Sequence, residues 1–371
     1  MMKIPFLDLS RQHRAIKTEL LGAVERVLDS SQFVLGGEGR ALEGELAALA
    51  GVRHGIGLGS GTDALRLALI AVGVGPGDEV ITPAFSFVAS ASTVVMAGAT
   101  PVFVDIEPVT YGLDPELLER ALTPRTRAII PVHLYGHPAC IDRIADVARR
   151  HGVALIEDAA QAIGATWDGR PIGGWGDAAC LSFYPTKNLG ACGDAGLLLT
   201  DRDDVAEHVR RLRHHGDSGR YQHVELGYCS RLDEVQAAML RVKLRRLDAW
   251  TEARRRLAAR YRAGLAGLPL GLPVEDPRAR HIYHQFIVRH PQRDALGKVL
   301  ADLGVGTMVH YPRAVPDQPL FGLDGERRWP QAWRAARGAL AAVLSGDDRG
   351  RGRRRRGRGA RGGRSRVSEW P

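Results

Sequence analysis

The chain has 371 residues, enough for more than one domain, and its 44% apolar and 25% charged residues are typical of a globular protein rather than a disordered or fibrous one. Four scattered cysteines without a Cys-x-x-Cys pair predict neither a zinc site nor a disulfide framework, so we expect reduced thiols, no metal and a cytoplasmic location. Because no run of about 18 apolar residues occurs, we expect no membrane span.

Most of the net charge of +9 lies at the C-terminal end of the sequence. Residues 338–371 contain ten arginines and three acidic residues, a net of +7, whereas residues 1–337 carry only +2. A Gly/Arg-rich segment cannot bury apolar surface, so we expect a disordered tail. Such a tail could bind nucleic acid only non-specifically, through counterion release, and the folded body shows no excess of basic charge.

The first predicted element is a helix over residues 10–29, with Ser10 as the expected N-cap. From about residue 55 to 200, short apolar runs alternate with amphipathic stretches. This alternation predicts an α/β fold with a mainly parallel sheet, because strands buried on both faces read as continuous apolar runs. The expected strands are EVITP, TPVFVDI, RAIIPVHL, VALIEDAA, AACLSFY and GLLLTD, and LDPELLERAL and IDRIADVARRHG are expected helices.

A smaller unit is predicted after a long helical region at 232–267. The pattern there is a strand in HIYHQFIVRH, a helix in RDALGKVLADLG and a strand in VGTMVHYP. We therefore expect a large domain over residues 1–245, which includes the N-terminal helix, a small α+β domain over 246–337, and the tail over 338–371.

Two segments could bind an anion and a planar ring. In GLGSGTDAL, the backbone N–H groups of Gly61 and Thr62 would open a helix and attract a phosphate, although an ordinary capped turn explains the segment equally well. The glycines of GIGLG are spaced wrongly for a dinucleotide-binding motif. In TPAFSFVAS, Phe85 could lie on a ligand ring, and a core phenylalanine is the alternative reading.

Two further segments carry a carboxylate and an amine at the ends of predicted strands. ALIEDAAQAIG places Asp158 where a strand leaves the core, as a partner for a protonated ring nitrogen or as a helix N-cap. SFYPTKNLG places Lys187 after a buried run, as a solvated loop residue or as a lysine that forms a Schiff base. Pyridoxal 5'-phosphate is bound by this set of contacts: a phosphate site, a stacking ring, a carboxylate and an amine. The combination is far more specific than any one of them.

The same residues resemble a known family. SGTDAL, TPAFSFVAS, PVFVDI, EDAAQAIGA, GDAACLSFYPTKNLGA, GDAG, SRLDEVQAA and VHYP look like the DegT/DnrJ/StrS nucleotide-sugar aminotransferases. The resemblance implies a homodimeric, fold-type-I enzyme that moves an amino group from glutamate to a nucleotide-linked keto sugar, best guessed as a dTDP-3-keto-6-deoxyhexose. A 4-keto sugar or a keto-inositol stays open.

The resemblance also implies a role for each site residue. Lys187 would carry the cofactor and move protons, and Asp158 would bind the pyridine nitrogen. The remaining cofactor residues would be Ser60, Gly61, Thr62 and Ser182 at the phosphate, Phe85 on the ring, Gln161 at the ring hydroxyl, and Cys229; His310 and Tyr311 would line the sugar side.

Two departures from the family pattern stand out. Cys229 occupies a position where relatives usually have an asparagine that reaches the neighbouring subunit's phosphate, so we expect weaker cofactor binding, since a thiol is a weak donor. The abrupt change to Arg/Gly-rich sequence near residue 338 is also what a shift of reading frame would produce. The alternative function is a non-catalytic regulator of the same fold that binds pyridoxal phosphate or a sugar nucleotide; the retention of Asp158 and Lys187 disfavours it.

Overall fold

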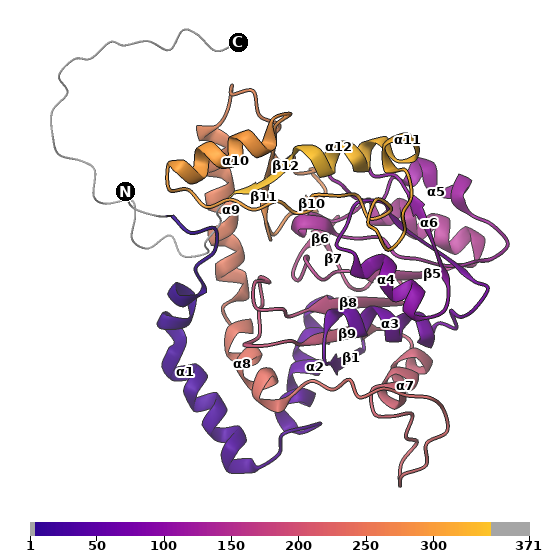
Figure 1. Cartoon of the computed structure of the whole chain (residues 1–371). Helices are drawn as coiled ribbons and strands as arrows, with labels where there is room; N and C mark the ends of the chain where they lie inside the picture. Colours follow the sequence, from indigo (N-terminus) through magenta and orange to yellow (C-terminus); the bar gives the residue numbers. More distant parts are fainter. Residues whose placement is uncertain (1–3, 343–371) are drawn as a thin grey trace, which may run out of the picture.

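A seven-stranded sheet forms the centre of the larger part of the molecule, in a computed structural model that describes residues 4–342 (Figure 1). The strands are β1 (His54–Leu58), β2 (Glu79–Pro83), β3 (Thr100–Val104), β4 (Thr126–Ile129), β5 (Ala154–Asp158), β8 (Ala178–Ser182) and β9 (Gly196–Thr200). Their order is β1-β9-β8-β5-β4-β2-β3. Only β9 runs against the others, pairing antiparallel with β1 and β8, so the predicted mainly parallel α/β fold is confirmed.

Helices cover both faces of this sheet because the strands are apolar on both sides. In β5, Leu155 packs into one core cluster and its neighbour Ile156 into the other, as side-chain alternation along a strand requires. One face carries α2 (Gly37–Ala50), α5 (Pro115–Ala121), α6 (Ile141–His151) and α8 (Glu234–Leu244). The other face carries α3 (Gly61–Ala71), α4 (Ala89–Met96) and α7 (Asp203–Leu212).

The N-terminal helix α1 (Leu9–Ser30) packs on α8 through Ile16, Leu20 and Val27. Its N-cap is Asp8, whose carboxylate accepts the backbone N–H of Ser10 at 3.1 Å. The predicted cap Ser10 was therefore wrong by two residues, since a carboxylate in the preceding turn already satisfies that donor.

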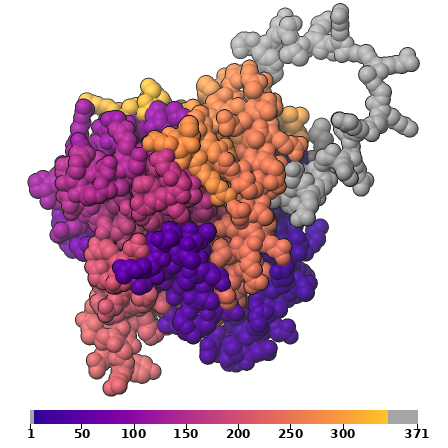
Figure 2. Space-filling view, turned by 180° about the vertical axis from the view of Figure 1, so that it is seen from behind, coloured from indigo at the N-terminus to yellow at the C-terminus, as the bar shows by residue number. Residues whose placement is uncertain are grey.

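A smaller C-terminal unit begins with α9 (Leu247–Gly264) and lies next to the large sheet (Figure 1). In the space-filling view its orange surface adjoins the magenta surface of the larger part (Figure 2). A two-stranded antiparallel sheet, β11 (Phe286–Arg289) with β12 (Ala339–Ala342), packs with helices α10 (Arg293–Asp302), α11 (Gly325–Arg328) and α12 (Pro330–Gly338). The expected strand VGTMVHYP was wrong: it makes only isolated bridges at Val305 and Met308.

Residues 339–342 were expected in the tail, yet they form β12. Their run Ala-Leu-Ala-Ala is apolar, and Ala339, Leu340 and Ala341 are buried against the small unit. The rest of the predicted tail lies outside the described residues. The predicted boundary after residue 245 falls between α8 and α9, and the division into domains remains a prediction.

A third, three-stranded sheet connects the two units. It consists of β6 (Thr166–Trp167), β7 (Arg170–Pro171) and β10 (Ala279–Arg280), in the order β10-β6-β7. A short 3-10 turn, η1 (Leu134–Gly136), lies after β4. Within residues 4–342, no helix has the length and apolar character needed to cross a membrane.

Candidate active site

The four predicted site segments meet at one edge of the sheet. Parallel strands end at the same side, so the turns after β1, β2, β5 and β8 lie close together there. The turn after β8 is tightly built: the backbone N–H of Lys187 donates to the oxygen of Tyr184 at 2.8 Å. Gly190 closes it, because a Cβ there would lie 2.3 Å from the oxygen of Pro185. The glycine of SFYPTKNLG is therefore required for the turn that presents the lysine.

Lys187 is partly buried, and its ammonium has no hydrogen bond or ion pair with any residue that the structure describes. Burial lowers the pKa of Lys187 to about 8, and the charge of Asp158 acts in the opposite direction. At pH 7 about one-tenth of an amine with such a pKa is unprotonated, whereas an ordinary lysine with a pKa near 10.4 is almost entirely protonated. Lys187 is therefore suited to attack a carbonyl carbon.

Asp158 is a buried carboxylate at the end of β5, and it is only 5% exposed. Its oxygens accept hydrogen bonds from the backbone N–H of Ala160 at 3.2 Å and from the hydroxyl of Ser90 at 3.0 Å. Burial raises the pKa of Asp158, while these two bonds and the charge of Lys187 lower it. No cation touches this carboxylate among the described residues, so a protonated pyridine nitrogen would supply the missing partner.

The N-terminus of α3 lies against Ser182. Ser60 caps the helix by accepting the N–H of Asp63 at 3.0 Å, which leaves the N–H groups of Gly61 and Thr62 without a partner inside the helix. A Cβ on Gly61 would lie 2.6 Å from the Cβ of Ser182, so only glycine allows this approach. Two free N–H groups and two hydroxyl side chains fit a phosphate at a helix end.

The ring-stacking prediction for Phe85 does not agree with the structure. Phe85 is fully buried among apolar side chains that include Tyr111 and Tyr135, so neither of its faces is open to a ligand. Phe87, two residues later in the same motif, is 51% exposed, and its ring centre lies 5.8 Å from that of Tyr311. The motif predicted that an aromatic residue lies on the ligand ring, and the exposure of the two side chains favours Phe87 over Phe85 for that position.

Gln161, Tyr311 and His310 lie together in the structure, and their predicted contacts with the cofactor and the sugar remain predictions. The side-chain oxygen of Gln161 accepts the N–H of Tyr135 at 2.7 Å, and its nitrogen lies 3.1 Å from the hydroxyl of Tyr311. The hydroxyl of Tyr135 donates to the backbone oxygen of His310, whose ring Nδ1 is buried without a partner among the described residues. Burial raises the pKa of both tyrosines, so both phenols stay protonated at neutral pH. Sequence reasoning missed Tyr135 and Ser90, because neither stands in a charged or glycine-rich motif.

Cys229 is exposed near the N-terminus of α3. Its sulfur accepts a hydrogen bond from Arg231 at 3.0 Å. The next residue, Ser230, donates to Asp63 at 2.9 Å and accepts the N–H of Gly59 at 3.1 Å. The residue after Cys229 is thus bonded to the turn that leads into α3, while the thiol itself lies exposed. The described residues include no group of His, Cys, Asp and Glu side chains that could hold a metal ion.

Residues 14–344 match the model of the DegT/DnrJ/EryC1/StrS aminotransferase family. The chain belongs to this family. It is 49% identical over 348 residues to a pleiotropic regulatory protein of Geobacillus stearothermophilus, a match that covers 92% of this chain and 94% of that protein. It is also 45% identical to a UDP-N-acetyl-3-dehydro-alpha-D-glucosamine 3-aminotransferase of Acidithiobacillus ferrooxidans, covering 92% of each, and 46% identical to a dTDP-3-amino-3,4,6-trideoxy-alpha-D-glucose transaminase of Streptomyces venezuelae, covering 92% and 91%.

Comparison with solved structures also identifies aminotransferases as similar in fold and sequence. The fold matches that of S. venezuelae DesV in complex with a ketimine intermediate with a TM-score of 0.91 and 45% identity, over 93% of this chain and 94% of that one. It matches NtdA of Bacillus subtilis with bound cofactor PMP with a TM-score of 0.86 and 34% identity, over 93% and 81%. The predicted family, the fold-type-I architecture, the aminotransferase class and the dependence on pyridoxal phosphate are confirmed.

Proposed function

We propose that this aminotransferase moves an amino group from glutamate to a nucleotide-linked keto-deoxysugar, with a dTDP-3-keto-6-deoxyhexose as the first choice. One observation carries the proposal: an unpaired Lys187 with a pKa of about 8 stands at the same sheet edge as the buried Asp158. The curated names of two relatives, a 3-aminotransferase and a 3-amino-sugar transaminase, support the choice of the 3-position. Amino-sugar biosynthesis in the cytoplasm is the setting that we infer.

In this proposal some site residues bind the cofactor, and Lys187 also transfers protons. When it is bound, pyridoxal phosphate supplies an electron-withdrawing ring that stabilises negative charge on the carbon losing its proton. Lys187 would hold the cofactor covalently through its amine, and the same amine, once free, would accept and return the proton that moves during the transfer. Asp158 would pair with the protonated pyridine nitrogen, and Phe87 would lie against the ring.

We assign the phosphate of the cofactor and the sugar of the substrate to two different sets of residues. Ser60, Gly61, Thr62 and Ser182 would bind the phosphate through N–H and O–H groups, and so anchor the cofactor through its phosphate arm. His310 and Tyr311 line the sugar side, with Gln161 orienting the hydroxyl of Tyr311. The buried, unpaired Nδ1 of His310 is a polar atom that a sugar hydroxyl would satisfy.

A homodimer is part of the proposal. The loop between α7 and α8 projects from the body in both views (Figures 1 and 2), and it carries the exposed side chains of Tyr221 (90%), Val224 (63%) and Leu226 (84%). Apolar side chains this exposed suit a protein interface. Cys229 lies in the same loop, and we expect it to face the phosphate of a second copy.

A regulatory role is the second candidate, because one relative is named a pleiotropic regulatory protein and another a sensory transduction protein. A binder that lacks catalysis has no need for an unpaired lysine beside a buried carboxylate. Borohydride reduction of the protein with pyridoxal phosphate, followed by peptide mapping, tests the site: we expect the pyridoxyl mass on Lys187. Glutamate-dependent amination of a panel of 3-keto and 4-keto nucleotide sugars then tests the substrate. Labelled protein that aminates none of them would favour the regulator.

A further inference from the structure

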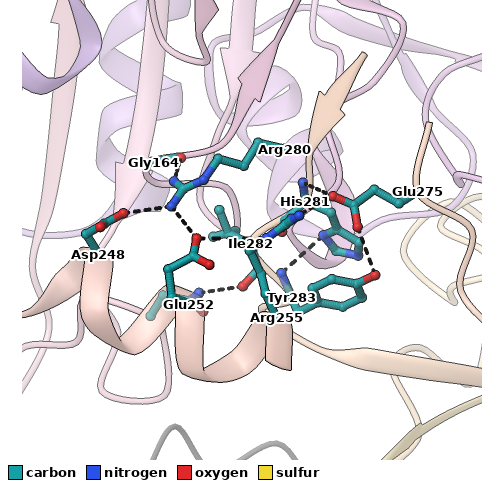
Figure 3. A network of polar contacts seen from close by, with 10 residues as sticks. Gly164, Asp248, Glu252, Arg255, Glu275, Arg280, His281, Ile282 and Tyr283 are labelled. Carbon is teal, nitrogen blue, oxygen red and sulfur yellow. Dashed lines mark hydrogen bonds and ion pairs between the residues drawn. The ribbon is translucent and has the colours of Figure 1, made fainter. Parts of the chain in front are cut away.

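Residues 281–285, here called the crossover segment, join β10 to β11 and run between α9 and the active-site turns. Figure 3 shows how the start of this segment is tied to α9. Arg280 donates to Asp248 at 2.6 Å and to Glu252 at 2.8 Å, and Arg255 donates to the backbone oxygen of His281 at 2.7 Å. The ion pairs of Arg280, the residue before the crossover segment, and the hydrogen bond to His281 anchor the segment on the small unit.

The other side of the crossover segment is bonded to the turn that carries the catalytic lysine. Asn188, the residue after Lys187, donates from its amide nitrogen to the backbone oxygen of Ile282 at 3.2 Å. Its amide oxygen lies 3.1 Å from Nδ1 of His284. Both side chains are buried, with 6% of Asn188 and 8% of His284 exposed. The side chain of Asn188 thus forms two hydrogen bonds that fasten the lysine turn to the small unit.

These contacts determine the protonation of His284. Because the Asn188 nitrogen donates to Ile282, its oxygen must accept, and Nδ1 of His284 therefore carries a proton. Burial lowers the pKa of His284 well below its usual value, and the charges of Lys187, Arg254, His310 and His281 act in the same direction. The ring is neutral, and its Nε2 keeps a free lone pair.

Arg254 reinforces the neutral form of His284. Its guanidinium donates to the backbone oxygens of Tyr283 and His284, both at 3.2 Å, and within residues 4–342 no carboxylate pairs with it. Burial lowers the pKa of Arg254 to about 10, which still leaves it charged at neutral pH. A protonated His284 would place a second cation beside it, which Coulomb repulsion disfavours.

We propose that His284 is a positioning residue for Lys187. Its neutral ring holds Asn188, and Asn188 sets the direction in which the neighbouring lysine leaves the turn, so that the amine points toward the cofactor aldehyde. The inference rests on the assignment of Lys187 in the proposed function. A displacement of about 1 Å at a reacting group can slow a reaction about 100-fold, so a link of this kind has a measurable effect.

The test measures how fast cofactor-free protein captures pyridoxal phosphate on Lys187, by its visible band and by borohydride mapping. His284→Phe keeps a ring but removes the donor, and we expect capture to slow at least about tenfold. His284→Asn places an amide N–H where Nδ1 stood, and we expect its capture rate to stay close to that of the unaltered protein. His151→Gln, at an exposed histidine of α6, is the control.

Each outcome decides the matter. Slow capture by His284→Phe with rescue by His284→Asn supports the proposal. Unchanged capture by folded His284→Phe overturns it, and so does equal slowing of both variants with an equal loss of Tm, which would mean a packing role only. If His284→Phe does not fold, Asn188→Leu replaces it with the same expected slowing, and normal capture overturns the proposal. If the unaltered protein labels elsewhere than Lys187, the site assignment is wrong and this inference fails with it.

Discussion

Two lysines of this enzyme are removed from water in different ways. Lys243 on α8 is 1% exposed, and its ammonium donates to the oxygen of Gly190 at 2.6 Å and lies 3.1 Å from Nε2 of His13. Lys187 keeps part of its surface open, and its ammonium has no hydrogen bond with the residues that the structure describes. Burial lowers the pKa of both side chains.

The difference separates a lysine that is hydrogen-bonded within the fold from the lysine to which we assign the reaction. The Lys243 ammonium holds the end of the turn that carries Lys187, so its cost of burial is offset by hydrogen bonds. The Lys187 ammonium has no such compensation among residues 4–342, and a covalent bond to a cofactor would supply it. A lowered pKa alone would not distinguish the two; the hydrogen-bond partners do.

The largest expected effect comes from removing the reactive lysine. Lys187→Ala should lower kcat at least about 1000-fold, because both the covalent attachment and the proton carrier are lost. Steady-state kinetics with glutamate and a keto sugar would measure it. The Tm should stay unchanged or rise, since no hydrogen bond is lost; activity within tenfold of the original would show that Lys187 is not the cofactor lysine.

Asp158→Asn is expected to lower kcat about 100-fold, because an amide cannot keep the pyridine nitrogen protonated. The amide has nearly the same shape as the carboxyl, so the fold should be retained, as circular dichroism would show. The absorbance of the bound cofactor gives an independent reading. Unchanged kinetics would mean that the buried carboxylate serves the fold and not the ring.

Lys243→Met should lower the stability of the fold and leave the labelling of Lys187 intact, whereas Lys187→Ala should lower the activity and leave the stability intact. The Lys243 substitution leaves the oxygen of Gly190 unsatisfied, so we expect the free energy of unfolding to fall by about 1–3 kcal/mol, measured by urea denaturation. The protein that remains folded should still be labelled on Lys187. Loss of labelling with unchanged stability would contradict the assignment of Lys243 as the structural lysine.

The smallest expected effect is at Cys229. An asparagine donates a stronger hydrogen bond than a thiol, and one such bond contributes about 0.5–1.5 kcal/mol, so Cys229→Asn should lower the Kd of the cofactor about two- to tenfold. Fluorescence titration of cofactor-free protein would measure this change, with Cys140→Ser as a cysteine control outside the site. An equal Kd would mean that residue 229 does not reach the phosphate.

The fold and the site differ in how far the sequence predicted them. Apolar runs gave the central strands, since a strand buried on both faces has a continuous signal. The segment with Met308 also looks like a strand, yet it makes only isolated bridges, because strand propensity is weak without a partner edge. Likewise, β12 was hidden by its closeness to the arginine-rich tail.

Motifs identified Lys187 and Asp158 because charged groups at strand ends are unusual. The same motif could not separate Phe85 from Phe87, since two residues on an irregular exit from a strand differ only in burial. His284 and Asn188 were not predicted at all: they are 96 residues apart, and only tertiary structure brings them within 3.1 Å.

Competitive labelling of cofactor-free protein with trace acetic anhydride, followed across pH by peptide mass spectrometry, tests the contrast between the two lysines most directly. Only the unprotonated amine reacts, so labelling of Lys187 should rise with pH and reach its midpoint near pH 8. Exposed lysines should reach theirs near pH 10.4, and Lys243, which is enclosed, should stay unlabelled in the folded protein. A midpoint for Lys187 near that of the exposed lysines, or reaction of Lys243 before Lys187, would contradict the account.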